Sequence, residues 1–259
     1  MNYLIIFLVC MTLFVILFQL KIIKKLARMD KIIFNLDKSM GTALLNEFQQ
    51  IQAMDGLQLI LKLEYPMPSI RGWAGSPDFL LQIAKASCAM KPKNMLECSS
   101  GTSTVVLART AKLNGVGHVY SLESDEIFAQ KTRDELNHQG LADFATVIYA
   151  PLVSHSIHGE HFDWYSLDNL PRKCFDMLVI DGPPANLKGK ARYPALPLLS
   201  KHLRAGAVIF LDDAGRIGEQ QVIQRWRKDF PEATVEHIAA EKGLVKIKWT
   251  SPAETTVCH

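Results

Sequence analysis

Between residues 76 and 249, short apolar runs alternate with amphipathic stretches of helical spacing. Strand–helix alternation at this spacing predicts a doubly wound α/β fold with a mostly parallel sheet. Two closely spaced apolar runs at the end of this region predict a C-terminal antiparallel hairpin. The expected strands are residues 94–98, 118–123, 145–150, 175–181, 207–213, 233–238 and 244–249, and the expected helices are residues 76–90, 102–115, 124–140, 193–206 and 218–230.

Acidic residues recur where the expected parallel strands stop. In open α/β sheets, ligands bind outside the carboxyl ends of the strands. A single acid there is usually a loop or helix-cap residue, but a recurring set is poorly explained by core packing. The set therefore predicts a functional site at this edge, and its members are Glu97, Glu123, Asp181, Asp212 and Asp213.

The loop after the first expected strand, 99-SSGTS-103, has small residues that let a ligand approach the backbone. It lacks GxGxxG and GxxxxGK[ST], so it is not built to hold a pyrophosphate. Glu97 would repel phosphate and suit a cationic ligand. Glu123, 22 residues beyond Gly101, is placed to accept hydrogen bonds from a ribose diol. S-adenosylmethionine, a nucleoside with a positively charged amino acid end and no phosphate, satisfies both observations.

The motifs in order also resemble class I S-adenosylmethionine-dependent methyltransferases, in the branch related to small-molecule and sugar O-methyltransferases. They are LECSSGTSTVVLA, VYSLESD, VIDGPP, RYPALPLL and VIFLDDAGR, with RGWAGSPDFL upstream, and they span about residues 71–249. The resemblance implies a Rossmann-like fold. The first motif departs from the usual pattern, because Cys98 and Ser99 fill the loop before Gly101.

The resemblance also implies roles for particular residues. The residues expected at the methionine end of the cofactor are Glu97, Ser99, Gly101 and Ser103. Glu123 is expected to hold the ribose, Asp181 to contact the cofactor and act in catalysis, and residues 149–152 to contact adenine.

Asp181, Asp212 and Asp213 also predict a metal site. Three converging carboxylates without a nearby Lys or Arg repel one another, and Mg²⁺ or a similar divalent cation would relieve that repulsion. Catechol-type O-methyltransferases show a similar pattern, which implies that the ion lowers the pKa of a substrate hydroxyl. The alternatives are that Asp181 orients the cofactor, that Asp213 caps the next helix, and that Arg216 pairs with Asp181.

The segment 154-SHSIHGEH-161 carries three histidines at intervals of three residues. On a helix they would share a face suited to a metal ion. Gly159 and the polar neighbours favour a loop over the mouth of the site.

Residues 3–20 contain no charged side chain and just reach the length that crosses a bilayer. The alternative is a cleaved signal peptide, but no basic segment precedes the run and no small-x-small site follows it. The cluster that follows the run, Lys21, Lys24, Lys25, Arg28 and Lys31, predicts a single-pass anchor in the cell membrane with the catalytic domain on the cytoplasmic side.

Beyond the anchor, apolar residues follow the 4-3-4-3-4 spacing of a coiled coil, which suggests a homodimer. They are Ile22, Leu26, Met29, Ile33, Leu36 and Met40. The alternative is one amphipathic helix lying on the membrane or on the domain. The expected organisation is an anchor at residues 1–20, a helical linker at 21–66 and a methyltransferase domain at 67–259.

Together these patterns predict a membrane-anchored S-adenosylmethionine-dependent O-methyltransferase acting on a hydroxylated small molecule or a lipid-linked glycan unit. One alternative is a membrane scaffold that kept the fold and lost catalysis, because the glycine loop is degenerate. The other is a different nucleoside-cofactor enzyme, which the missing GxGxxG disfavours. The net charge of +3 over 259 residues argues against nucleic acid as a partner.

Overall fold

The computed structural model describes residues 2–68, 74–184 and 190–250, and the chain forms two compact units, Met1–Gln49 and Gln50–His259. The second unit is built on a seven-stranded sheet in the order β3-β2-β1-β6-β7-β9-β8. The strands are β1 (Asn94–Cys98), β2 (His118–Glu123), β3 (Ala145–Tyr149), β6 (Phe175–Ile180), β7 (Leu203–Leu211), β8 (Thr234–Ile238) and β9 (Leu244–Lys248).

The first five of these strands are parallel, and β9 pairs antiparallel with both β7 and β8. This confirms the predicted Rossmann-like fold with a C-terminal antiparallel hairpin. Because β1 is central and the order reverses beside it, the carboxyl ends of β1, β2, β6 and β7 meet at one edge.

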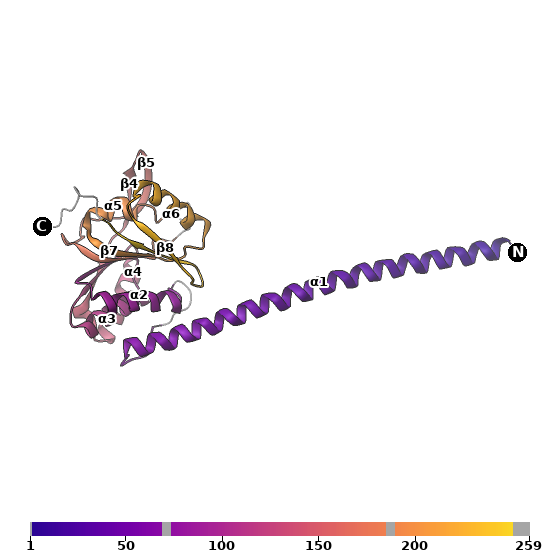
Figure 1. The fold of residues 1–259 in the computed structure, drawn as a ribbon, viewed down its shortest axis with the longest axis horizontal. Coiled ribbons are helices and arrows are strands. Elements are labelled where there is room, and N and C mark those ends of the chain that lie inside the picture. The colour runs from indigo at the N-terminus through magenta and orange to yellow at the C-terminus, as the bar shows by residue number, and fades with distance from the viewer. Residues whose placement is uncertain (1, 69–73, 185–189, 251–259) are drawn as a thin grey trace. The chain divides into compact units, whose positions relative to one another are not determined.

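The two faces of the sheet carry separate apolar cores, because side chains along a strand alternate between faces. Met95 and Val179 pack under the end of α1 (Asn2–Leu61) and under α2 (Pro77–Met90), α3 (Thr102–Asn114) and α4 (Glu126–His138). Leu96 and Ile180 pack on the opposite face against α5 (Ala195–Leu199) and α6 (Ile217–Asp229). Figure 1 shows α2 and α3 on one side of the sheet and α5 and α6 on the other.

The predicted helix 193–206 is much shorter than expected. Only Ala195–Leu199 is α-helical, a 3₁₀ turn follows at Ser200–His202, and β7 already begins at Leu203. Pro197 lies inside the short helix and cannot donate the backbone hydrogen bond that a longer helix needs. A second 3₁₀ turn, Ala142–Phe144, precedes β3.

Residues 152–165 form a β-hairpin, where the sequence suggested a loop. Strand β4 (Leu152–Ile157) pairs antiparallel with β5 (Glu160–Tyr165), and His158 and Gly159 form the turn with positive φ values. Glu160 pairs with Arg225 of α6 at 3.0 Å, and Phe162 lies against Tyr193. The hairpin is therefore fastened to the face covered by α5 and α6 (Figure 1).

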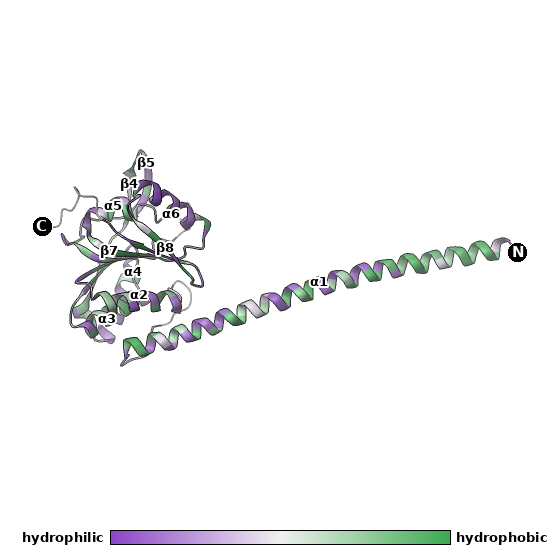
Figure 2. Ribbon diagram, in the orientation of Figure 1, coloured by the Kyte–Doolittle hydropathy of each residue, from purple (hydrophilic) through white to green (hydrophobic). Residues whose placement is uncertain are grey.

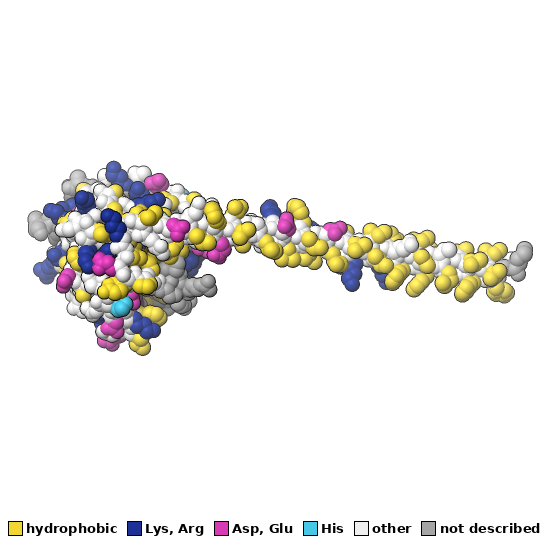
Figure 3. Space-filling view, turned by 90° about the horizontal axis from the view of Figure 1, so that it is seen from below, with side chains coloured by type: hydrophobic (Ala, Val, Ile, Leu, Met, Phe, Trp, Pro, Cys, Tyr) yellow, Lys and Arg dark blue, Asp and Glu magenta, His cyan; other side chains and the backbone are white. Residues whose placement is uncertain are grey.

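In the first unit, residues 2–49 belong to one unbroken helix, which continues as α1 to Leu61. α1 is the one helix in the described part of the chain that is long and apolar enough to cross a membrane. Its N-terminal side chains are almost all hydrophobic and exposed, and positively charged residues follow them (Figures 2 and 3). The expected boundaries at residues 20 and 66 stay predictions.

Candidate functional site

The loop that joins β1 to α3 has the backbone of a glycine-rich turn although it contains one glycine. Ser99 has φ 93° and Gly101 has φ 151°, values that L-residues rarely adopt. A Cβ at Gly101 would meet no atom within 4 Å, so the backbone conformation alone explains the glycine there. Strained backbone of this kind is concentrated at ligand-binding sites.

Glu97 lies at the end of β1 and is completely buried. Its Oε2 accepts a hydrogen bond of 2.5 Å from Thr104, which in turn accepts one from the Gly101 N–H. Burial raises the pKa of Glu97 to about 7, although the hydroxyls of Ser103, Thr104 and Ser121 oppose that rise. Oε1 has no hydrogen-bond partner among the described residues. A buried carboxylate with an unused oxygen fits a cationic group.

Glu123 ends β2, and both of its carboxylate oxygens accept hydrogen bonds. Oε2 accepts from the N–H of Ser100 at 2.9 Å and from the Ser100 hydroxyl at 3.0 Å, and Oε1 accepts from the Asp125 N–H at 3.0 Å. A carboxylate offers about four acceptor sites, and Oε2 already accepts two bonds and Oε1 one, so Oε1 keeps a site for a ribose hydroxyl. Glu123 thus also holds the β1–α3 loop in place.

The remaining predicted residues lie close by. Ser103 is buried in the first turn of α3. Tyr149 ends β3, and the N–H of Ala150 donates to the Glu123 carbonyl at 2.7 Å. The acids that end β1 and β2 and the segment after β3 therefore lie along one edge of the sheet.

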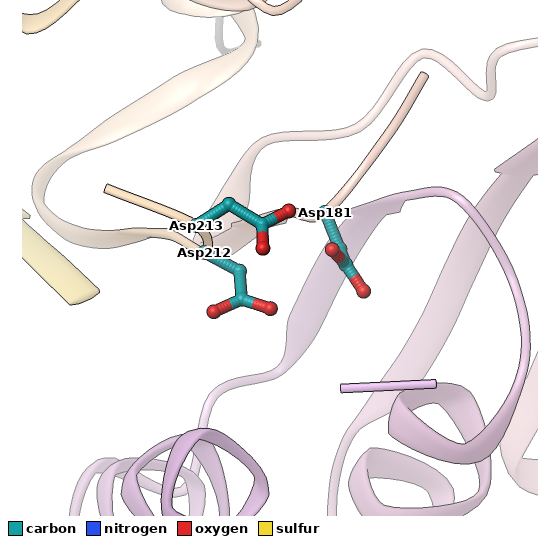
Figure 4. Close-up of side chains that lie close together, drawn as sticks. All are labelled: Asp181, Asp212 and Asp213. Carbon is teal, nitrogen blue, oxygen red and sulfur yellow. The ribbon is translucent and has the colours of Figure 1, made fainter. Parts of the chain in front are cut away.

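Asp181, Asp212 and Asp213 come together as predicted (Figure 4). One carboxylate oxygen of each lies within 4.8 Å of the others. Asp213 has φ 58°, so the β7 end is also strained.

The premise that no basic residue offsets these acids is wrong. Arg192, which is 2% exposed, lies 2.7 Å from Asp213 and 3.4 Å from Asp181, and it donates to the Asp212 carbonyl at 2.8 Å. Arg216 pairs with Asp213 at 2.9 Å and not with Asp181. Sequence reasoning did not identify Arg192 as the counter-charge, because ten residues separate it from Asp181 along the chain.

Asp212 makes no such pairing. Both of its oxygens, and Oδ1 of Asp213, are buried without a hydrogen-bond partner among the described residues. Burial, together with the charges of Asp181 and Asp213, raises the pKa of Asp212 to about 7. Burial also raises the pKa of Asp181, although the charge of Arg192 opposes that rise. The cluster thus keeps unpaired oxygen ligands of the kind that hard cations take.

Tyr165 is a residue of this edge that the sequence reasoning missed. It ends β5 and is 1% exposed. Its hydroxyl lies so close to Gly182 that a Cβ on that glycine would collide with it, and the same Cβ would lie 2.8 Å from the Cβ of Ser99. The available signal was a tyrosine at the end of a short run that contains other aromatic residues. Nothing in the sequence placed that run over the ends of β1 and β6.

Comparison with known proteins agrees with this geometry. Residues 96–214, which include every one of the predicted site residues, match a family model described as a methyltransferase domain. A comparison with curated proteins finds no match.

Solved structures share the fold at low sequence identity. The SAH-bound methyltransferase PaMTH1 of Podospora anserina is 14% identical, with a TM-score of 0.54 over 76% of this chain and 87% of its own. The O-methyltransferase of Bacillus cereus in complex with SAH is 18% identical, with a TM-score of 0.53 over 80% of this chain and 97% of its own. TomG of Streptomyces achromogenes, an O-methyltransferase in complex with SAM, is 16% identical, with a TM-score of 0.50 over 78% and 89%.

Proposed function

The chain carries a class I S-adenosylmethionine-dependent methyltransferase domain, and from that premise we propose that it methylates a hydroxyl oxygen of a small acceptor. The observation that carries the proposal is the pair of acids that end β1 and β2 on either side of the Gly101 loop. Glu97 keeps one buried oxygen without a partner among the described residues, and Glu123 holds the loop by Ser100. The oxygen acceptor is supported by the solved O-methyltransferases that share the fold.

S-adenosylmethionine supplies the activated methyl group when it is bound. In this proposal Glu97, Ser99, Gly101 and Ser103 contact its methionine end, and Glu123 accepts hydrogen bonds from its ribose. Asp181, at the end of the neighbouring strand β6, contacts the cofactor and faces the acceptor. Residues that hold both reactants in line reduce the entropic part of the barrier to methyl transfer.

We further propose that Asp181, Asp212 and Asp213 hold Mg²⁺ or a similar divalent cation. The unpaired oxygens of Asp212 and the free Oδ1 of Asp213 support this assignment, and the nearby charge of Arg192 weakens it. A bound cation would lower the pKa of the acceptor hydroxyl. Activity that survives a strong chelator in full would exclude the metal role.

Anchoring by residues 3–20 motivates the choice of a lipid-linked glycan unit as the acceptor. The exposed apolar surface of this segment and the basic cluster after it support an anchor that leaves the domain in the cytoplasm. A soluble hydroxylated molecule is the alternative acceptor.

Residues 22–40 support a parallel homodimer of anchored chains. With Leu26, Ile33 and Met40 at the a positions of a heptad, Lys24, Lys31 and Lys38 lie at f, opposite the apolar seam. Lys25 then lies at a g position and Asp30 at the following e position, where the two chains of a parallel coiled coil pair opposite charges. The unbroken course of α1 through this segment supports the coiled coil over a helix lying on the membrane surface.

The deciding experiment measures methyl transfer by the full chain from labelled S-adenosylmethionine into membrane extracts, with mass spectrometry of the products. A species that gains one methyl group on oxygen is the expected result. Binding without transfer to any extract would favour a scaffold that lost catalysis, and failure to bind would favour a different nucleoside cofactor.

A further inference from the structure

The β4–β5 hairpin lies outside the seven-stranded sheet, yet it sends one polar group to the carboxyl edge of that sheet. The hairpin leaves the end of β3, where the Ser166 N–H donates to the Pro151 carbonyl at 2.9 Å. Its last residue, Tyr165, is also fastened at the backbone, because its carbonyl lies 3.1 Å from Nε2 of His155. The ring is buried, and its hydroxyl lies where a Cβ on Gly182 would be, close to the side chain of Ser99.

That hydroxyl has no hydrogen-bond partner in the part of the chain that the structure describes, although the residue is 1% exposed. Buried tyrosine hydroxyls usually find a partner. The neighbouring Tyr193 shows the usual arrangement, because its hydroxyl donates to Asp229 at 2.7 Å. Tyr165 thus places a donor at this edge that no described residue receives.

Burial and the charged groups around Tyr165 determine whether its hydroxyl is protonated and so what kind of group it can bind. Burial raises the pKa of Tyr165 well above its ordinary value, and the charges of Cys98, Glu123 and Asp181 raise it further, while Arg192 opposes them. The hydroxyl stays protonated and acts as a donor. The carboxylates of Glu123 and Asp181 lie near enough to act through their charge but accept no hydrogen bond from it. The hydroxyl is therefore a donor that a bound ligand can use.

We infer that the Tyr165 hydroxyl binds the carboxylate of the methionine end of S-adenosylmethionine, beside Ser99 and Gly182. The inference rests on the proposed function, in which Ser99 contacts the same end of the cofactor. It also explains Gly182, since any side chain there would displace the hydroxyl. The hairpin then contributes a cofactor-binding residue to the site.

The test compares Tyr165→Phe with Tyr193→Phe in the full chain in detergent micelles. Because the Tyr165 hydroxyl has no partner among the described residues, Tyr165→Phe should leave the Tm without ligand unchanged and raise the Kd for S-adenosylmethionine roughly tenfold, as expected for one hydrogen bond to a charged group. Tyr193→Phe should do the reverse, because its hydroxyl bonds Asp229 and not the cofactor. Calorimetry gives the Kd and thermal denaturation the Tm.

Two results would overturn the inference. One is an unchanged Kd in Tyr165→Phe, and the other is a Tm that falls together with affinity, which marks a hydroxyl with a structural role. If the unaltered chain does not bind S-adenosylmethionine, the proposed function fails instead, so the two failures are distinct.

A second pair of variants tests the contact itself. Gly182→Ala should lower both Tm and cofactor affinity, because its Cβ would collide with the Tyr165 hydroxyl. Adding Tyr165→Phe removes the closer of the two collisions, the other being with the Ser99 Cβ at 2.8 Å, and should restore part of the Tm without restoring the affinity. A double variant no more stable than Gly182→Ala would contradict the placement of the hydroxyl.

Discussion

Single side chains at the carboxyl edge differ in how well the protein satisfies them. Glu123 has a donor on each oxygen, whereas Glu97 and Asp212 keep oxygens without any partner among the described residues. A buried group without a partner costs free energy unless it changes its protonation state or meets a ligand. Glu123 therefore organises the loop, whereas Glu97 and Asp212 keep oxygens that a cation could contact.

Replacing Glu123 with alanine should abolish detectable binding of S-adenosylmethionine. The change removes the proposed ribose contacts and also releases Ser100, which leaves its N–H without the acceptor that holds the β1–α3 loop. Calorimetry on the full chain measures the effect. Glu126→Ala, an exposed acid three residues away, is the control and should bind as the unaltered chain does. Equal affinity of Glu123→Ala and this control would show that the cofactor lies elsewhere.

Glu97 should make the stability of the ligand-free protein fall as the pH rises. Its pKa is about 7 in the folded state and 4.5 in its ordinary state, so between these values the folded protein keeps a proton that the unfolded chain has lost. Its contribution is fully present below pH 4.5 and is lost as the pH rises toward 7. Glu97→Gln should remove up to roughly 3 kcal/mol of this fall, measured by denaturant unfolding across that range.

A second buried acid contributes to the same pH dependence. Asp212 also has a pKa raised to about 7 and remains in the variant, so the pH dependence should flatten but not vanish. Unfolding curves of Glu97→Gln that keep the full pH dependence would mean that Glu97 is charged in the folded protein.

At the scale of elements, the order of strands and helices could be read from the sequence because burial imposes a regular pattern. Runs such as 177–180 are apolar throughout, since both of their faces are covered. The β4–β5 hairpin escaped this reasoning because most of its exposed positions are polar and break the apolar pattern. The His158–Gly159 turn between two six-residue runs was the signal available for it.

The end of α1 also depends on a contact that the sequence did not reveal. Arg109 of α3 donates to the carbonyls of Leu61 and Lys62 and pairs with Glu64 at 2.9 Å. These carbonyls close the last turn of α1, so the guanidinium caps the helix. A buried arginine that is 48 residues away in the chain cannot be assigned to a helix end by spacing alone.

The heptad segment of α1 should bring two chains together in membranes. In a chain with Cys10→Ser, a cysteine introduced by Leu36→Cys lies on the apolar seam and should form disulfide-linked dimers on mild oxidation, visible on a non-reducing gel. Lys31→Cys, on the opposite side of the helix, is the matched control and should not. Comparable dimer yields at the two positions would contradict a defined seam.

The charge pair supplies a second test of the same interface. Asp30→Lys should lower the yield of Leu36→Cys dimers by placing like charges opposite each other, and adding Lys25→Asp should restore it. Failure of the double exchange to restore the yield would argue against the parallel register.

For the whole molecule, the sequence predicted which acids meet at one edge of the sheet better than it predicted the charges that offset them. Acids at strand ends follow from topology, because parallel strands bring their carboxyl ends to one edge. The positions of Arg192 and Tyr165 depend on how a loop returns and how a hairpin packs, and both are set by tertiary contacts between distant segments. Such contacts produce no periodic pattern in a sequence. Only the structure therefore revealed that Arg192 offsets the acids and that no described residue accepts a hydrogen bond from the Tyr165 hydroxyl.

The anchor and the acceptor can be tested together in the whole chain. Val9→Lys with Leu13→Lys places two charges in the apolar span, each costing roughly 2.5–3.5 kcal/mol at the centre of a membrane helix. The variant should move to the soluble fraction while its affinity for S-adenosylmethionine stays unchanged, because the second unit is untouched.

If the acceptor is lipid-linked, incorporation of labelled methyl into lipid extracts should fall sharply, because enzyme and acceptor no longer share a surface. Val9→Ala with Leu13→Ala keeps the span apolar and is the control. Full activity of both variants on soluble sugars, with none on membrane extracts, would reject the lipid-linked acceptor and favour a soluble one.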